Sequence, residues 1–150
     1  MSNILYEANP NNEEHIQELK QLEKENKIPN LLSELATLNK GEVKKVLFTK
    51  KDNTINNIIY IDGYNDIHEC NIYLYNTATH KLELIDLGVE YATEVLDMKE
   101  VYFHIPNNKN MINTLTKKGY EYIGNLDKTD EIIFMKDVEE DKVKKTNMRR

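Results

Sequence analysis

Three residues with reactive side chains follow one another in the chain: His68, Glu69 and Cys70. A histidine, a carboxylate and a thiolate are all metal ligands, and a thiolate is also a nucleophile. The surrounding pattern predicts a strand, however, and neighbouring strand residues point to opposite faces of a sheet. The three side chains therefore do not converge on one ion, and we expect no metal site. Because no recognisable motif links a histidine to Cys70, we interpret Cys70 as a small core residue.

The most regular part of the chain, Lys81–Gly119, follows these residues and organises the rest. Apolar residues recur every three or four positions over Lys81–Met98, which predicts an amphipathic helix. Val101–Ile105 then predicts a short apolar strand. A second helix follows and ends at Gly119, a usual helix stop. This order favours a layered α/β architecture.

The rest of the chain repeats the same two kinds of pattern. One strand is predicted first, and then two helices, of which the earlier is capped by Asn12. Short polar turns at Lys51–Asn53 and Asp62–Gly63 separate the next strands, which favours an antiparallel meander. Besides Val101–Ile105, the predicted strands are Asn3–Ala8, Val43–Thr49, Ile55–Ile61, Ile67–Tyr75, Tyr120–Gly124 and Glu131–Lys136. The predicted order is β-α-α-β-β-β-α-β-α-β-β.

The composition is that of a soluble globular chain, with 39% hydrophobic and 31% charged residues in a length of 150. We expect one domain over residues 1–136 and a polar, mobile tail over residues 137–150. The single cysteine excludes an internal disulfide. No apolar run approaches the roughly 20 residues of a membrane helix, and the N-terminus lacks a signal pattern, so we expect a cytoplasmic protein. The net charge of −6 argues against nucleic acid as a partner.

The order and lengths of these elements resemble the GNAT superfamily of N-acetyltransferases over residues 3–136. The most specific segment is Asn108-x-x-Met111-x-x-x-Leu115-x-x-x-Gly119-Tyr120. It is similar to a segment on the family's fourth helix in its spacing, its asparagine and its final glycine-aromatic pair. The resemblance implies an α/β (α+β) fold: a mixed, mostly antiparallel sheet of about seven strands with helices on both faces.

The resemblance also implies acetyl-CoA as the cofactor, between the strands Ile67–Tyr75 and Val101–Ile105. The family binds the pyrophosphate on a glycine-rich loop, where backbone N–H groups and a helix dipole meet the phosphates. The matching segment here, residues 76–81, contains no glycine. Its threonines could cap the helix, and His80 and Lys81 could meet a phosphate as point charges. The implied cofactor-binding residues are Tyr75, Thr77, Thr79, His80, Lys81 and Asn108.

The implied catalytic residues include one departure from the family. Leu115 stands where the family has a tyrosine that protonates the leaving thiolate, so the acid would have to be a water or another tyrosine, of which Tyr64, Tyr73 and Tyr120 are the candidates. Glu69 lies on the strand where some members place a carboxylate that deprotonates the amine through water. The resemblance thus implies Glu69 as the general base, whereas alternation along the strand also fits a solvent-side residue.

Simpler interpretations exist for the other candidates as well. Asn108 can cap its helix, His80 can be an ordinary first-turn residue, and His104 can be a packed core or rim histidine. Tyr73 and Tyr75 can pack under a helix instead of lining a cleft. These interpretations need no ligand, and we favour them for the three polar residues.

Two functions from different classes remain open at this stage. One is an acetyl-CoA-dependent N-acetyltransferase that acts on a small amine or a protein amine. The other is a diverged, non-catalytic module that keeps the fold and acts through protein–protein contacts, because a fold does not fix a function. The missing glycines and Leu115 favour the second. A homodimer is compatible with either.

Overall fold

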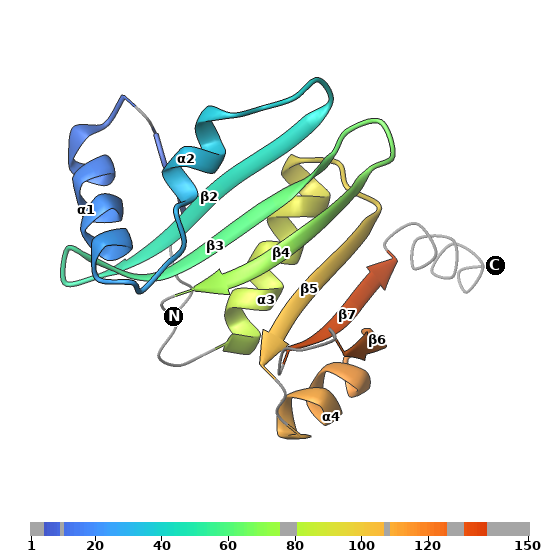
Figure 1. The fold of residues 1–150 in the computed structure, drawn as a ribbon. Helices are drawn as coiled ribbons and strands as arrows, with labels where there is room; N and C mark the ends of the chain where they lie inside the picture. Colours follow the sequence, from blue (N-terminus) through green and yellow to red (C-terminus); the bar gives the residue numbers. More distant parts are fainter. Residues whose placement is uncertain (1–4, 10, 76–80, 107–108, 126–130, 138–150) are drawn as a thin grey trace.

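A computed structural model describes residues 5–9, 11–75, 81–106, 109–125 and 131–137 (Figure 1). The strands are β1 (Tyr6–Glu7), β2 (Glu42–Lys51), β3 (Thr54–Tyr64), β4 (Glu69–Tyr75), β5 (Glu100–Pro106), β6 (Glu121–Asn125) and β7 (Glu131–Asp137). The helices are α1 (Glu13–Lys24), α2 (Leu31–Ala36), α3 (Lys81–Glu90) and α4 (Lys109–Lys117), and a π-helical turn, η1 (Tyr91–Val95), extends α3. The elements follow the order predicted from the sequence.

The seven strands form one mixed sheet in the order β1-β2-β3-β4-β5-β7-β6. Neighbouring strands are antiparallel except β4 and β5, which are parallel. The long crossover from β4 to β5 carries α3, as a parallel connection requires. These features confirm the predicted fold class.

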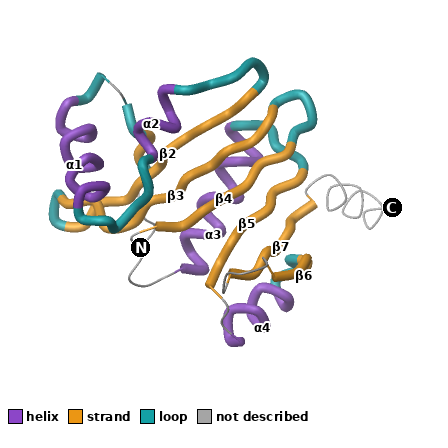
Figure 2. Tube along the Cα trace, in the orientation of Figure 1, coloured by secondary structure: helices purple, strands orange, loops and turns teal. Residues whose placement is uncertain are grey.

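Helices cover the two faces of the sheet to different extents (Figure 2). On one face α1 and α2 lie over β2 and β3, where they bury residues such as Leu19, Phe48 and Ile58. On the other face α3 and α4 bury the larger core around Ile72 and Phe103. Among the described residues, no helix lies over β4, β5 and β7 on the α1–α2 face (Figures 1 and 2). We call this uncovered surface the open face.

The predicted turn at Asp62–Gly63 is wrong, because β3 continues through both residues to Tyr64. Gly63 pairs with Cys70 across the ladder, and a Cβ at Gly63 would meet the carbonyl oxygen of Glu69 and lie 2.6 Å from the Cβ of Cys70. The glycine thus allows close approach of two strands rather than a turn. The true turn follows at residues 65–68, and β4 begins at Glu69 instead of Ile67.

The predicted helix Lys81–Met98 is too long at its end. After Glu90 the chain takes a π-helical turn, and the N–H of Leu96 donates to the carbonyl oxygen of Tyr91 at 3.2 Å. Asp97 then adopts a left-handed conformation with φ of 57°, which stops the helix. Within α3, Gly88 lets the helix approach the sheet, since a Cβ there would lie 3.3 Å from Ile72.

Candidate active site

Two neighbouring strands of the sheet separate at one end. β4 and β5 form parallel pairs up to Tyr73–His104, but β4 continues to Tyr75 and β5 to Pro106. The last two residues of each strand therefore lie outside the β4–β5 ladder. Figure 1 shows the tips of the two arrows pointing apart. The strands thus form a V whose vertex is the Tyr73–His104 pair.

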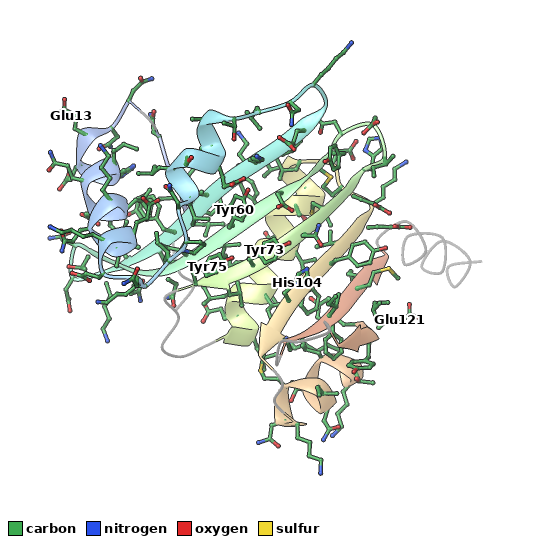
Figure 3. All side chains as sticks on the ribbon, in the orientation of Figure 1. Glu13, Tyr60, Tyr73, Tyr75, His104 and Glu121 are labelled. Atoms are coloured by element: carbon green, nitrogen blue, oxygen red, sulfur yellow. The ribbon has the colours of Figure 1, made fainter. Side chains whose placement is uncertain are left out.

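Four rings gather at this vertex, on the same face of the sheet as α1 and α2 (Figure 3). Tyr60, Tyr73 and His104 are cross-strand partners on β3, β4 and β5. The ring centroids of Tyr73 lie 5.9 Å from Tyr60, 4.6 Å from His104 and 6.5 Å from Tyr75, with the rings close to parallel. Burial, reinforced by the charge of Asp62, raises the pKa of Tyr60. The stack holds the side chains at the vertex in fixed orientations.

A hydrogen-bonded chain of side chains leads from the vertex to β3. His104 Nε2 donates to Asn71 Oδ1 at 3.2 Å, since an amide oxygen can only accept. Asn71 also forms a hydrogen bond with the carboxylate of Asp62, its partner on β3. Burial raises the pKa of Asp62, and the hydrogen bond from Asn71 opposes part of that rise. The chain fixes the His104 tautomer with its hydrogen on Nε2.

Two carboxyl groups face each other at the opposite end of the β4–β5 ladder. Glu69 and Glu100 are partners there, and the hydroxyl of Tyr102 donates to Glu100 Oε2 at 3.2 Å. The pKa of Glu69 is raised, first by its hydrogen bond to Glu100 and then by burial and charge repulsion. A cavity of about 330 Å³ opens beside this pair, lined by Gly63, Tyr64, Ile67, Glu69, Cys70, Asn71 and Tyr102. We call this region the acidic end of the open face.

Two of the predicted site residues lie on the open face. Tyr75 ends β4 beyond the vertex. Glu69 lies four residues before the Tyr73 position, about 13 Å along the strand. Its role as general base stays a prediction, and a base at that distance would need a chain of several water molecules to reach the vertex.

The remaining predicted cofactor-binding side chains fall outside the described residues: Thr77, Thr79, His80, Lys81 and Asn108. Of these positions, only the backbone of Lys81 is described, and it begins α3. Their roles stay predictions.

The three tyrosines considered as acids lie in different places. Tyr64 is 48% exposed and lines the cavity at the acidic end. Tyr120 is buried on the α3–α4 side, where its hydroxyl donates to Asp86 Oδ1 at 3.1 Å. Tyr73 alone among the three lies at the vertex. Leu115 is fully buried in the core, so its side chain serves packing.

Sequence reasoning missed Tyr60, Asp62 and Asn71. A signal for them exists, because alternate residues share one face of a strand and pairing carries that face across the sheet. Reading β4 in steps of two gives Glu69, Asn71, Tyr73 and Tyr75 on one face. The misplaced turn at residues 62–63 hid the matching positions on β3.

Cys70 is 1% exposed, which confirms it as a core residue, and burial raises the pKa of its thiol to about 12. Within the described ranges, no group of three or more His, Cys, Asp or Glu side chains is arranged to hold a metal ion. No helix in the same part of the chain has the length and apolar character needed to cross a membrane.

A larger cavity, of about 430 Å³, lies between α2 and β2, away from the V. Its lining is mostly apolar, and its charged residues are paired. Lys45 Nζ lies 2.8 Å from Glu7 Oε1, and Lys44 Nζ lies 3.1 Å from Glu34 Oε2. No two paired strands separate at this cavity, and its lining residues include no cluster of reactive groups. We therefore centre the candidate site on the V.

Comparison with solved structures identifies the fold. Campylobacter jejuni N-acetyltransferase PseH in complex with acetyl coenzyme A is similar at 17% identity over 89% of this chain and 97% of that chain, with a TM-score of 0.59. A probable acetyltransferase from Staphylococcus epidermidis gives 14% identity, coverages of 90% and 98%, and a TM-score of 0.59. The spermidine N-acetyltransferase SpeG from Vibrio cholerae, as a mutant, gives 13% identity, coverages of 81% and 73%, and a TM-score of 0.51.

No protein-family model matches the sequence, and no curated protein matches it either. At these low identities the likeness to solved structures concerns the fold alone. The chain therefore has the GNAT fold, as the sequence resemblance implied.

Proposed function

We propose that this GNAT-fold chain is an acetyl-CoA-dependent N-acetyltransferase that acts on an amine. The observation that carries the proposal is the end of the β4–β5 ladder at Tyr73–His104, although both strands continue. Strand edges outside a ladder offer backbone N–H and C=O groups to an extended ligand. The pantetheine arm of acetyl-CoA is an extended chain with amide groups, so its chemistry suits the opening.

The phosphate end of acetyl-CoA would meet the start of α3. This helix begins at Lys81, directly after the loop predicted to bind the pyrophosphate. The N-terminus of a helix attracts anions through its dipole and its unpaired N–H groups. The proposed binding residues are therefore those the resemblance implied: Tyr75, Thr77, Thr79, His80, Lys81 and Asn108.

Bound acetyl-CoA would supply a thioester, whose acetyl group passes to the amine nitrogen as the thiol leaves with a proton. The protein's own contribution is orientation and proton transfer. Tyr73 and His104 flank the vertex, where an acceptor on the open face meets the V. Glu69 is the proposed base, acting through a chain of several water molecules, and Tyr73 is the proposed acid because it lies at the vertex.

Binding of acetyl-CoA is the first test of this function. A ligand that binds only the folded state raises its stability by roughly 2.7 kcal/mol at about 100 times the dissociation constant. We expect a saturable rise in Tm with acetyl-CoA, confirmed by calorimetry, and no comparable rise with ATP. Release of free thiol should then depend on an added amine. No shift at millimolar acetyl-CoA would contradict the enzyme and favour the non-catalytic binding module.

A matched pair of variants tests where the pantetheine arm of acetyl-CoA binds. Asn108→Ala removes the amide that the resemblance assigns to the pantetheine arm, and loss of one hydrogen bond should weaken acetyl-CoA binding by about tenfold. Asn110→Ala makes the same change on an exposed position of α4. We expect this second variant to bind as the unchanged protein does. Equal losses in both variants would count against the assignment.

A further inference from the structure

Part of the edge of the sheet beside α2 lacks a neighbouring strand. β1 has only two residues, and after it the N–H of Ala8 donates to the carbonyl oxygen of Val46 at 2.8 Å. The chain then leaves the sheet, and α1 begins at Glu13. Among the described residues, no strand pairs with Glu42–Lys45 of β2 on the β1 side. We call this stretch the free edge of β2, and α2 lies beside it (Figures 1 and 2).

The backbone of the free edge presents hydrogen-bonding groups to the outside. Residues two apart on a strand direct their backbone groups to the same side, and the carbonyl group of Val46 points to β1. The N–H and C=O groups of Lys44 and Glu42 therefore point away from β3. The N–H of Glu42 already donates to the carbonyl oxygen of Asn39 at 3.0 Å. The free edge thus offers a donor and an acceptor at Lys44 and a further acceptor at Glu42.

The cavity of about 430 Å³ lies along this same edge. Its lining includes three consecutive residues of β2, namely Lys44, Lys45 and Val46. Consecutive side chains of a strand point to opposite faces, so a cavity lined by all three meets the strand at its edge. Glu7 and Ala8, at the end of β1, line it as well. The cavity therefore occupies the place that β1 would take if it continued.

Apolar side chains line the other side of the cavity. They come from α1, from α2 and from the residues after α2: Ile16, Leu32, Leu35, Ala36 and Leu38. Leu38 is 55% exposed, although a large apolar side chain is stabilised by burial. A ligand in this place would bury an apolar side chain against α2, and its main chain would bond to the edge of β2. Both features together are those of a site that binds an added strand.

The two lysines of the free edge are neutralised by the protein itself. Lysine on an edge strand usually prevents pairing by directing its charge to solvent. Here the side chain of Lys44 is only 10% exposed, and its Nζ lies 3.1 Å from Glu34 Oε2 and 3.0 Å from the carbonyl oxygen of Thr37. Lys45 Nζ lies 2.8 Å from Glu7 Oε1. Neither lysine therefore directs an unpaired charge at an approaching strand.

We propose that the free edge of β2 binds a short extended peptide of a partner protein, which adds to the sheet as a strand and places an apolar side chain between α2 and β2. A small apolar molecule would fill the cavity without using the backbone groups of Lys44. A second copy of this chain is disfavoured by size, since four strand residues span about 13 Å, whereas a stable interface buries about 800 Å² on each partner. Glu7, Glu34 and Glu42 surround the two lysines, so a peptide without acidic side chains suits the local charge.

Four synthetic peptides test this mode of binding by calorimetry. The first is acetyl-Lys-Thr-Leu-Thr-Leu-Thr-Lys-amide, and in the second serine replaces each leucine. The third and fourth carry N-methyl groups on the leucines or on the threonines, which removes the N–H donors from one edge of the peptide strand or from the other.

We expect the serine peptide to bind at least tenfold more weakly than the first, because it buries no apolar side chain. One N-methylated peptide should lose about tenfold or more, and the other should bind as the first does, because only one edge of the peptide faces β2. The affected peptide also reveals whether the added strand is parallel or antiparallel. Equal affinities of the two N-methylated peptides, or no binding of the first, would overturn the proposal.

A matched pair of variants locates the peptide. Leu38→Asp places a charge in the apolar lining and should weaken binding of the first peptide roughly tenfold. Val95→Asp makes a similar change at a 62% exposed apolar side chain of η1, which extends α3 on the other face of the sheet. We expect this control to bind as the unchanged protein does, and an unchanged Tm shows that both variants are folded. Equal affinities of the two variants would refute the location.

Hydrogen exchange measured by NMR identifies the occupant directly. The amide of Lys44 should exchange at least tenfold more slowly with the first peptide bound, whereas the amide of Lys45, which points to β3, should not change. Protection of Lys44 that rises with protein concentration alone would replace the peptide with a second copy of the chain. Binding of 1-octanol that Leu38→Asp abolishes, with no binding of any peptide, would make the cavity a small-molecule site. Either result would overturn the proposal.

This proposal does not depend on the transferase function. β3 and β4 separate the free edge of β2 from the V. Leu38→Asp should therefore bind acetyl-CoA as the unchanged protein does. Failure of acetyl-CoA to bind would leave the peptide site standing, and failure of the peptides would leave the transferase function standing.

Discussion

The two faces of β4 and β5 are built from alternate residues of the same strands, yet they differ in burial, polarity and contacts. On the α3–α4 side, Ile72 and Phe103 are fully buried in the main core. On the open face, the intervening Asn71, Tyr73 and His104 are half-buried and joined by hydrogen bonds and ring stacking. Period-two alternation thus lets one strand pair pack in the core on one side and carry polar and aromatic side chains on the other. The open face still touches the smaller core under α1 and α2, because Tyr73 and Tyr75 pack against that cluster, but the larger core lies on the other side.

The largest effect should come from truncating the core side of this pair. Phe103→Ala removes a ring that lies 5.8 Å from Phe134 and 5.0 Å from Tyr120, measured between centroids. We expect a loss of about 3–5 kcal/mol in the free energy of unfolding, measured in urea, because a buried cavity remains. Tyr73→Leu, on the open face, should cost less than about 1.5 kcal/mol. Equal losses would show that the side chains of the two faces contribute equally to the free energy of unfolding.

The next effect concerns how closely β3 approaches β4. Gly63→Ala would place a Cβ against the backbone of Glu69 and the Cβ of Cys70, so the strands must move apart. We expect a loss of about 1–3 kcal/mol, as for other overpacked sites, measured by thermal or urea unfolding. Gly124→Ala is the control, since a Cβ at Gly124 meets nothing within 4 Å. If Gly124→Ala lost as much stability as Gly63→Ala, the loss would come from replacing a glycine in a strand and not from the close approach of β3 and β4.

A smaller effect should appear in the pH dependence of stability. Burial raises the pKa of Asp62 above its ordinary value of 3.8, so the folded state holds this proton more tightly than the unfolded chain does. Its contribution is fully present below about pH 3.8 and is lost as pH rises through the folded pKa. Asp62→Asn removes this titration, so we expect a flatter pH profile.

At neutral pH Asp62→Asn should be as stable as the unchanged protein or slightly more so. The difference should stay below about 1 kcal/mol because the carboxyl group is partly solvated. Urea unfolding at several values between about pH 4 and about pH 7 measures it. A variant that is less stable at neutral pH would show that the Asp62 carboxylate contributes to folding, contrary to the comparison of the two faces.

Much of the architecture was predictable because it depends on local rules. Apolar periodicity and turn residues gave the order of all elements, and Asn12 caps α1 as expected, accepting from the N–H of His15 at 3.2 Å. The errors arose where tertiary packing overrides local preference. Gly63 looks like a turn residue, but it lies inside β3 because β4 approaches it closely.

The candidate site was less predictable, for a physical reason. Asp62, Asn71 and His104 lie on three strands, and they meet only through the register of β3, β4 and β5. Register depends on pairing across the whole sheet, and a one-residue shift would send these side chains to the other face. A family resemblance directed attention to Glu69 instead, which lies at the acidic end of the same face. Its catalytic role stays a prediction.

The smallest expected effect is on the α3–α4 side, where Asp86 of α3 bonds to the segment that follows α4. Its carboxylate accepts from Lys118 Nζ at 2.7 Å and from the hydroxyl of Tyr120 at 3.1 Å. Asp86→Asn keeps the shape but removes the charge, and an exposed pair of this kind contributes about 0–1 kcal/mol. Urea unfolding at low and high salt should show a small loss that salt reduces further. A loss near that of Phe103→Ala would mean that charge, and not apolar packing, dominates the contact between α3 and the segment after α4.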